Sequence, residues 1–210
     1  MNKSILIIGR GKGIGNSIVK KYENTHNIFS ISRSEVKGDK SNVVHIQTDV
    51  SNFLENYKEF KNMSLSLIVF VLGQWGETGA LTIDEYENFL KTGPFNLLKI
   101  FNQLERDGCI EENATIINIG SISSEEALQY NSGTEYPAYS IMKLIQKAII
   151  TQLSRIHSNY KLSNITLGSI GEDDNGVGYE NLINTIDYLY NLKSGVRLSD
   201  VTLISKSDIK

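Results

Sequence analysis

The stretch from Ser4 to Gly15 reads SILIIGRGKGIG, and it decides the fold expected for the whole chain. Ile5 to Ile8 are four apolar residues in a row that end at a glycine. Such a run is too short for a helix and is typical of a strand buried on both faces. The glycines that follow keep Cβ atoms out of a turn, and a helical pattern begins at Asn16. Together these features present backbone N–H groups and the positive end of a helix dipole to a phosphate, so they predict a dinucleotide site.

Glycine-rich turns also occur for backbone reasons alone, without any ligand. Here the turn follows a strand and opens a helix at the beginning of the sequence, which is the context in which a phosphate site is expected. The residues of this turn that are expected to contact the cofactor are Gly9, Arg10, Gly11, Lys12, Gly13, Ile14 and Gly15.

Length and charge narrow the class of protein. A chain of 210 residues is most simply a single domain over residues 1–210, and it can bury a sizeable two-faced core. The net charge of −3 gives no electrostatic reason to expect nucleic acid or an anionic membrane as a partner. No apolar run is long enough to cross a bilayer and no signal-peptide layout is recognisable, so a cytoplasmic protein is expected.

The cysteine and histidine content bears on redox and metal chemistry. The one cysteine, Cys109, excludes an internal disulfide and fits a reducing compartment. It is either a reactive thiol or, as is more common for a lone cysteine, a small apolar residue. His26, His45 and His157 have no ligand-like spacing to one another, so no metal site is expected.

Strand-like and helix-like segments alternate along the whole chain. The expected strands cover residues 5–8, 27–32, 43–46, 65–72, 114–119, 164–170 and 201–204. Further helices are expected over residues 53–60, 82–104, 139–157 and 179–192. Gly93-Pro94 predicts a kink in the second of these, because Pro94 lacks a donor N–H. The alternation predicts an α/β fold of the Rossmann type, a doubly wound parallel sheet of about seven strands with helices on both faces.

Two features of the loops bear on ligands. In nucleotide-binding folds, an acid at the end of the second strand favours NAD, and a nearby arginine accommodates the 2′-phosphate of NADP. The Ser32-Arg33-Ser34 segment offers no acid at that point, and Lys12 adds a second cation. NADP is therefore expected, the alternative being that Lys12 and Arg33 are ordinary solvated side chains. Trp75, in a glycine-containing loop, either lines a pocket or is an exposed loop residue.

Three residues in the second half of the chain are candidates for chemistry. Ser121 follows the expected strand 114–119, at the sheet edge where ligands bind in open α/β folds. Tyr139 and Lys143 are four residues apart in a strong helical run, so both lie on one face of that helix.

In this order, the motifs resemble those of the short-chain dehydrogenase/reductase family over roughly residues 3–171. The spacing Gly9-x-x-x-Gly13-Ile14-Gly15 matches the family's glycine motif, and Ala138–Lys143 matches its Tyr-x-x-x-Lys helix. Ile117–Ser121 resembles the strand that delivers the family's serine, and Asp49-Val50 resembles its adenine-side acidic pair. The resemblance implies that cofactor contacts also come from Ser32, Arg33, Asp49, Val50, Gly73, Tyr139, Lys143 and Ile170.

The resemblance implies roles for Ser121, Tyr139 and Lys143 in the reduction of a carbonyl, which needs a hydride from the nicotinamide and a proton on the developing alkoxide. A tyrosine pKa near ~10 is too high for this role. The ammonium group of Lys143 and the charge of the oxidised nicotinamide are expected to lower it. Lys143 would also hold the nicotinamide ribose, and Ser121 would hydrogen-bond the substrate oxygen.

The sequence departs from the family pattern in several places. Leu90 stands where the family often has an asparagine, which argues against a proton relay through that residue. Phe70–Gly73 keeps only the glycine of the usual Asn-Asn-Ala-Gly, and Ile170-Gly171 replaces Pro-Gly. The Ser121–Tyr139 interval is longer than usual, while the expected substrate region, about 171–210, is short. An open pocket is implied, or one closed by residues 122–136 or by a partner subunit.

Assembly and function are expected as follows. Helices around residues 84–105 and 138–157 carry apolar residues on more than one face, and in the family they form the common subunit interface, so a homodimer or homotetramer is expected. The first function is an NADP(H)-dependent oxidoreductase, with NAD(H) less favoured, that interconverts a small-molecule carbonyl and alcohol. The second is a catalytically silent NADP-binding sensor or scaffold, favoured by Leu90 and the short substrate region. The scaffold hosts many chemistries, so the substrate is not identified.

Overall fold

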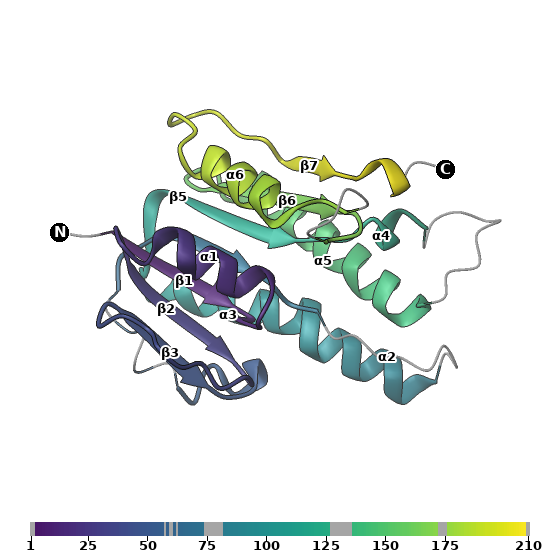
Figure 1. The fold of residues 1–210 in the computed structure, drawn as a ribbon. Helices are drawn as coiled ribbons and strands as arrows, with labels where there is room; N and C mark the ends of the chain where they lie inside the picture. Colours follow the sequence, from purple (N-terminus) through teal and green to yellow (C-terminus); the bar gives the residue numbers. More distant parts are fainter. Residues whose placement is uncertain are drawn as a thin grey trace.

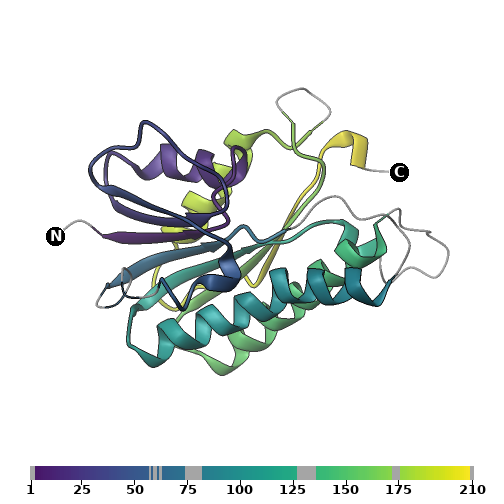
Figure 2. The same ribbon diagram turned by 90° about the horizontal axis from the view of Figure 1, so that it is seen from below.

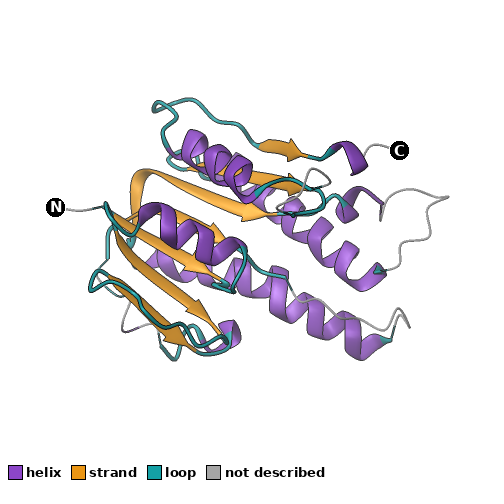
Figure 3. Cartoon of the chain, in the orientation of Figure 1, coloured by secondary structure: helices purple, strands orange, loops and turns teal. Residues whose placement is uncertain are grey.

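The computed structural model describes residues 3–56, 58, 61, 63–73, 82–126, 136–171 and 176–208. Seven strands within these segments form one sheet in the order β3-β2-β1-β4-β5-β6-β7, and every neighbouring pair is parallel. The strands are β1 (Ser4–Ile8), β2 (Asn27–Ser32), β3 (Val43–Gln47), β4 (Leu65–Phe70), β5 (Ile110–Ile119), β6 (Lys161–Leu167) and β7 (Asp200–Leu203). Their arrows point the same way in Figure 3. The expected doubly wound parallel sheet is confirmed.

Helices cover both faces of this sheet (Figures 1 and 2). On one face, α1 (Ile14–Tyr22) and α6 (Tyr179–Tyr190) pack in one apolar core. On the other face, α3 (Asn96–Arg106) and α5 (Pro137–Ile156) pack in a second core. The predicted helices over 139–157 and 179–192 therefore exist, with ends shifted by at most two residues.

Strand β1 belongs to both cores, as expected for the apolar run in front of the glycine turn. Ile5 and Ile7 face the α1 and α6 side, whereas Leu6 and Ile8 face the α3 and α5 side. All four side chains are fully buried. Because successive strand residues point to opposite faces, four apolar residues in a row supply two residues to each core.

The helical run that begins after residue 82 is interrupted where the sequence predicts a kink. It consists of α2 (Ile83–Leu90), a π-helical turn η3 (Lys91–Phe95) and α3, which follow one another directly. Pro94 cannot donate a main-chain hydrogen bond inside η3, which accounts for the wider turn. A Cβ atom on Gly93 would lie 2.6 Å from Cγ of Met142, so the missing side chain lets α5 pack closely against this turn.

Some boundaries differ from the expectations. Strand β6 ends at Leu167 and not at residue 170, so Gly168–Ile170 follow the carboxyl end of this strand. Of the helix expected over 53–60, the described residues 53–56 form a turn, which follows a 3-10 helix η1 (Val50–Asn52) capped by the Asp49 side chain through Ser51 N. Tyr57, Phe60 and Trp75 lie outside the described residues, as do residues 127–135.

Three further findings concern membranes, metals and the cysteine. No helix in the described segments is both long and apolar enough to cross a membrane. Among the same residues, no group of three His, Cys, Asp or Glu side chains is arranged to hold a metal ion. Cys109 forms no disulfide and is buried in the core beneath α3 and α5, which fits the interpretation as a small apolar residue.

Candidate functional site

Two neighbouring cavities open at the carboxyl ends of the strands, near the point where the strand order reverses between β1 and β4. The larger, of about 460 Å³, is lined by Ile14, Val71, Leu72, Gly73, Ile119, Gly120, Ser121, Ile122, Ser123, Tyr139, Lys143, Leu167, Gly168, Ser169 and Ile170. The smaller, of about 150 Å³, is lined by Gly9, Gly11, Ser32, Arg33, Ser34, Asp49, Val50, Val71, Leu72, Gly73 and Thr92. Because both share the wall Val71–Gly73, one elongated molecule can extend from one cavity into the other.

The glycine turn is tightly packed on its inner side and open on its outer side. Gly9 has a φ of +97°, and a Cβ atom there would lie 2.3 Å from the main-chain oxygen of Val71. A Cβ atom on Gly15 would lie 2.7 Å from Cα of Arg10. By contrast, nothing lies within 4 Å of a Cβ atom built on Gly11, which lines the smaller cavity. A turn of this shape at the start of α1 fits the pyrophosphate of a dinucleotide.

The sequence predicts that Arg10 contacts the cofactor, but its side chain lines neither cavity. This side chain is only 1% exposed. Its guanidinium donates to both carboxylate oxygens of Asp39, at 2.6 and 2.7 Å, and to Asn16 at 3.2 Å. The main-chain oxygen of Arg10 accepts from the Ser32 hydroxyl at 2.5 Å. Arg10 therefore ties the loop between β2 and β3 to the glycine turn, and its side chain is not part of the cavity surface.

The smaller cavity carries one cation and one carboxylate. Arg33 is exposed and follows β2 directly. The Asp49 side chain accepts from the hydroxyl and the main-chain N–H of Ser51, at 2.6 and 2.8 Å. These hydrogen bonds, with a smaller contribution from the charge of Arg33, hold the pKa of Asp49 below its ordinary value. Glu35, the nearest acid beyond Arg33, forms an ion pair with Lys37 at 3.2 Å.

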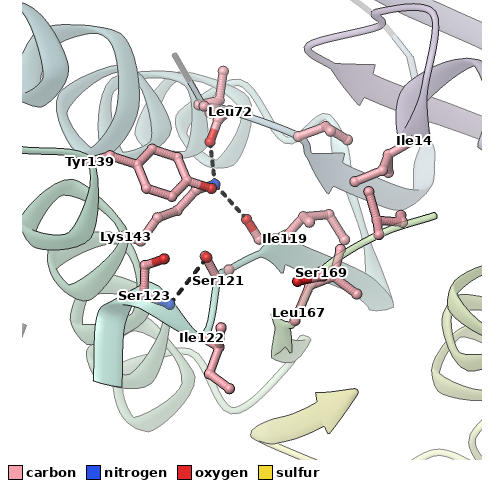
Figure 4. A pocket seen from close by; sticks show the side chains of 15 residues that line it. Ile14, Leu72, Ile119, Ser121, Ile122, Ser123, Tyr139, Lys143, Leu167 and Ser169 are labelled. Carbon is pink, nitrogen blue, oxygen red and sulfur yellow. Dashed lines mark hydrogen bonds between the residues drawn. The ribbon is translucent and has the colours of Figure 1, made fainter. Parts of the chain in front are cut away.

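The larger cavity contains the three residues that the sequence singled out for chemistry (Figure 4). Tyr139 and Lys143 lie one turn apart on α5, and Ser121 follows β5. The Lys143 side-chain nitrogen donates to the main-chain oxygens of Leu72, at 2.6 Å, and Ile119, at 2.8 Å. Burial lowers the pKa of Lys143 to about 7. A neutral amine has two N–H donors, and these two carbonyls accept both of them.

The pKa of Tyr139 does not move in the expected direction. Burial raises it above the ordinary tyrosine value, although a hydrogen bond with the Ser121 side chain acts in the opposite sense. Lys143 does not lower it, because burial disfavours the ammonium form of Lys143 itself. The phenol therefore keeps its proton at neutral pH within the surroundings that the chain itself provides.

Ser121 is held by the short helix α4 (Ser123–Glu126) that follows it. The Ser123 main-chain N–H donates to the Ser121 hydroxyl oxygen at 3.3 Å, and the Ser124 hydroxyl donates to the Ser121 main-chain oxygen at 2.7 Å. Gly120 precedes Ser121 in the chain, and a Cβ atom on it would lie 2.9 Å from the Asn164 side chain. These contacts fix the direction in which Ser121 enters the cavity.

Most of the predicted site residues line one of the two cavities. They are Gly9, Gly11, Ile14, Ser32, Arg33, Asp49, Val50, Gly73, Ser121, Tyr139, Lys143 and Ile170. Arg10, Lys12, Gly13 and Gly15 do not, and neither does Leu90. Sequence reasoning missed Thr92 in η3 and Ser169 after β6. The rule that ligands bind at strand ends would have found Ser169 if the end of β6 had been placed at Leu167.

Comparisons with known proteins bear on the fold. No family model matches the sequence, and no curated protein is significantly similar to it. Among solved structures, a short-chain dehydrogenase from Leptospira borgpetersenii with bound NAD+ has a TM-score of 0.81 at 16% identity, covering 100% of this chain and 94% of that one. The serine dehydrogenase of Escherichia coli has a TM-score of 0.77 at 15% identity, covering 96% and 97%. A variant of ElxO with NADPH bound has a TM-score of 0.72 at 17% identity, covering 96% and 97%. The chain therefore has the fold of short-chain dehydrogenases.

Proposed function

We propose that this protein is an NADP(H)-dependent oxidoreductase of the short-chain dehydrogenase/reductase type, which interconverts a carbonyl and an alcohol. The observation that carries the proposal is the meeting of Ser121, Tyr139 and Lys143 in a cavity that shares the wall Val71–Gly73 with the cavity at the glycine turn. A dinucleotide that extends through both cavities would bring its reactive ring to these three side chains. Bound NADP(H) would supply or accept the hydride.

Several residues support NADP over NAD as the cofactor. Arg33 lines the smaller cavity and is exposed, so it can meet a 2′-phosphate. Ser32 ends β2 without a carboxylate, and Glu35 is paired with Lys37. The exposed Lys12 adds a second positive charge in the glycine turn. Asp39, the other acid of this loop, is neutralised by Arg10, so it does not repel a phosphate.

The cavity's own residues account for the proton transfer. Because burial keeps the pKa of Tyr139 high, the phenol is protonated at neutral pH and can donate its proton to a substrate oxygen in the reduction direction. Ser121 would hydrogen-bond the same oxygen and stabilise the charge that develops on it. Lys143, which lines the larger cavity, would contact the nicotinamide ribose. Since its two N–H groups go to Leu72 and Ile119, the lone pair of the neutral amine would accept from a ribose hydroxyl.

The proposed substrate is a small molecule. Among the residues that the structure describes, Lys143 is the one charged side chain in the lining of the larger cavity, and isoleucine and leucine make up much of that lining. An uncharged carbonyl compound fits such a wall. We also propose that residues 1–210 act as one domain in the cytoplasm, that residues 171–210 border the substrate, and that the protein is a homodimer or homotetramer.

Oxidation of NADPH in the presence of a broad panel of aldehydes and ketones tests the proposal, with Tyr139→Phe as the inactive control. NADPH consumption that requires both a carbonyl compound and Tyr139 is the expected result. NADPH binding without any turnover would favour the alternative, a catalytically silent NADP-binding sensor or scaffold. Absence of NADPH and NADH binding would contradict both functions.

A further inference from the structure

The turn η4 (Lys206–Asp208) folds back onto the loop that follows β6. The Asp208 carboxylate accepts from the hydroxyl of Ser169 at 2.8 Å and from its main-chain N–H at 3.2 Å. It also accepts from the hydroxyl and the main-chain N–H of Ser205, both at 2.8 Å. A Cβ atom on Gly168 would lie 2.2 Å from this carboxylate, so the glycine permits the close approach. One carboxylate thus connects η4 to the wall of the larger cavity.

These contacts determine the direction in which the Ser169 hydroxyl donates its hydrogen bond. Although burial opposes ionisation, the hydrogen bonds from Ser205 and Ser169 hold the pKa of Asp208 below its ordinary value. A carboxylate only accepts hydrogen bonds, so the Ser169 O–H must donate to Asp208. The main-chain oxygen of Ser169 accepts from the Val177 N–H at 2.7 Å, but no group in the described part of the chain donates to the Ser169 hydroxyl oxygen. Its lone pairs are therefore available to a ligand.

Ser169 belongs to the same cavity as the candidate reaction residues. It lies with Leu167 across the cavity from Tyr139 and Lys143 (Figure 4). Its neighbours in the lining on that side, Leu167 and Ile170, are apolar. A small molecule whose carbonyl oxygen meets Ser121 and Tyr139 would thus find a second polar group at Ser169, surrounded by apolar side chains.

We infer that Ser169 is a specificity-determining residue, which accepts a hydrogen bond from an O–H or N–H group that the substrate carries close to its carbonyl. Asp208 is a positioning residue, because it holds the proton of Ser169 away from the ligand. The favoured substrates are carbonyl compounds that carry a hydroxyl or an uncharged N–H group, such as an amide, close to the carbonyl. This inference rests on the proposed function and adds a substrate class to it.

The inference predicts which substituents the cavity prefers, because the Ser169 hydroxyl donates to Asp208 and can only accept from a ligand. In Asp208→Asn, the amide can keep its carbonyl oxygen toward Ser205 and turn its NH₂ group toward the Ser169 oxygen. The Ser169 proton is then released toward the cavity, where it can donate to an ether or carbonyl oxygen. Asp208→Asn should therefore change which substituent is preferred, whereas Ser169→Ala should remove the preference.

Three ketones of similar shape distinguish these cases. 2-Hydroxyacetophenone offers a donor, 2-methoxyacetophenone offers only an acceptor, and propiophenone offers neither. We expect wild-type kcat/KM with NADPH to be about tenfold higher for the hydroxy ketone than for propiophenone, the value of roughly one hydrogen bond to an accessible group. Ser169→Ala should bring this ratio close to one. Asp208→Asn should raise kcat/KM for the methoxy ketone relative to kcat/KM for the hydroxy ketone. The control Ser207→Ala, in the same turn, should keep the wild-type ratio.

A binding measurement separates this inference from the proposed function. Dissociation constants of the three ketones are measured by titration calorimetry on the full chain with the catalytically impaired Tyr139→Phe background. The same order of preference, lost in Ser169→Ala, would support the inference even if none of the ketones is reduced. If Ser169→Ala leaves the ratio of the dissociation constants of the hydroxy ketone and propiophenone unchanged, the inference is overturned. Ser169→Ala removes only an exposed hydroxyl, so the test remains decisive if Asp208→Asn does not fold.

Discussion

The side-chain nitrogen of Lys143 lies 5.6 Å from the centroid of the Tyr139 ring, while its hydrogen bonds go to the main-chain oxygens of Leu72 and Ile119. The two side chains are one helical turn apart, as the four-residue spacing requires. The lysine is held by main-chain oxygens just after β4 and at the end of β5, and no charged side chain in the described segments pairs with it. Its charge state is therefore controlled by burial, and it differs from that of an exposed lysine.

The first prediction concerns the pH dependence of folding. Burial lowers the pKa of Lys143 from 10.5 to about 7, so between these values the unfolded chain binds one proton more than the folded chain. Stability must then rise with pH across this window, by roughly 1 kcal/mol per pH unit from this group alone. Below pH 7 both states are protonated and the slope disappears. Lys143→Met should lack this contribution.

Urea unfolding of both proteins between pH 6 and 10 measures the effect. The free energy of unfolding of the wild type minus that of Lys143→Met should rise through the window, since all other titrating groups cancel in the difference. A difference that does not change with pH would mean that Lys143 stays charged in the folded protein.

The second prediction concerns cofactor preference. Arg33→Ala should weaken NADPH binding by about ten- to a hundredfold, the value of a charge-assisted phosphate contact, and should leave NADH binding nearly unchanged. Lys99→Ala is the control, because Lys99 is an exposed cation of α3 that lines neither cavity. Fluorescence titration with both cofactors measures the ratio. Equal affinities of the wild type for NADPH and NADH would exclude the preference.

The third prediction concerns Arg10 and Asp39. Arg10→Ala would leave the carboxylate of Asp39 without its bidentate partner in a site where the arginine is almost fully buried. Loss of one partner of such a pair should lower the free energy of unfolding by about 3 kcal/mol. Lys12→Ala, an exposed cation in the same turn, should change it by less than about 0.5 kcal/mol. Urea unfolding at pH 7 compares the two variants.

The pH dependence of the Arg10→Ala effect follows from the same contact. Hydrogen bonds from Arg10 lower the pKa of Asp39 in the folded protein. The stabilisation is therefore complete above the ordinary pKa of 3.8 and is lost as the pH falls through the lower folded value. The difference between wild type and Arg10→Ala should shrink in that acidic range. A difference that is constant down to pH 2 would show that packing, and not the charge, is responsible.

The fourth prediction concerns assembly. Phe95 and Leu98 are three residues apart on the outer face of η3 and α3, and their side chains are 57% and 36% exposed. The helices α3 and α5 form the layer that covers one side of the sheet (Figure 2). If this layer forms the proposed subunit interface, Phe95→Glu should convert the oligomer to a monomer. Val196→Glu, at an apolar position that is 47% exposed in the loop before β7, is the control. Light scattering at micromolar concentration gives the mass, and a wild-type monomer of about 23.5 kDa would refute the proposal.

Much of the fold could be predicted because the signals are local. The apolar run Ile5–Ile8, the glycines after it and the Gly93-Pro94 pair each act on the backbone within a few residues, and the structure contains the strand, the turn and the π-helical turn that they require. The position of Ser121 at a strand end and of Tyr139 and Lys143 on one helix face likewise follows from local signals, whereas their meeting in one cavity was implied by the family resemblance.

What the sequence did not predict depends on contacts between distant segments. Arg10 and Asp39 are 29 residues apart, and Ser169 and Asp208 are 39 residues apart. No periodicity or motif connects the members of either pair, so neither contact could be predicted from the sequence. The direction of the Tyr139 pKa was missed for the same reason. It depends on how deeply the folded chain buries Tyr139 and Lys143, which the four-residue spacing does not reveal.

The last prediction concerns Tyr139 as the acid that protonates the substrate oxygen. Tyr139→Phe removes the hydroxyl and keeps the ring that packs in the apolar cluster with Phe89 and Met142, so the fold and NADPH binding should persist. Turnover should fall by the ~10²–10⁴ typical of a lost general acid. Lys143→Met should in addition weaken NADPH binding, because the contact of the lysine with the ribose would be lost. Steady-state kinetics combined with cofactor titration separates the two effects. If Tyr139 and Lys143 were two surface residues without a role in the reaction, neither the loss of turnover nor the weaker NADPH binding would be seen. A Tyr139→Phe variant that keeps most of its carbonyl reductase activity would exclude Tyr139 as the proton donor, even if the NADPH site were correct.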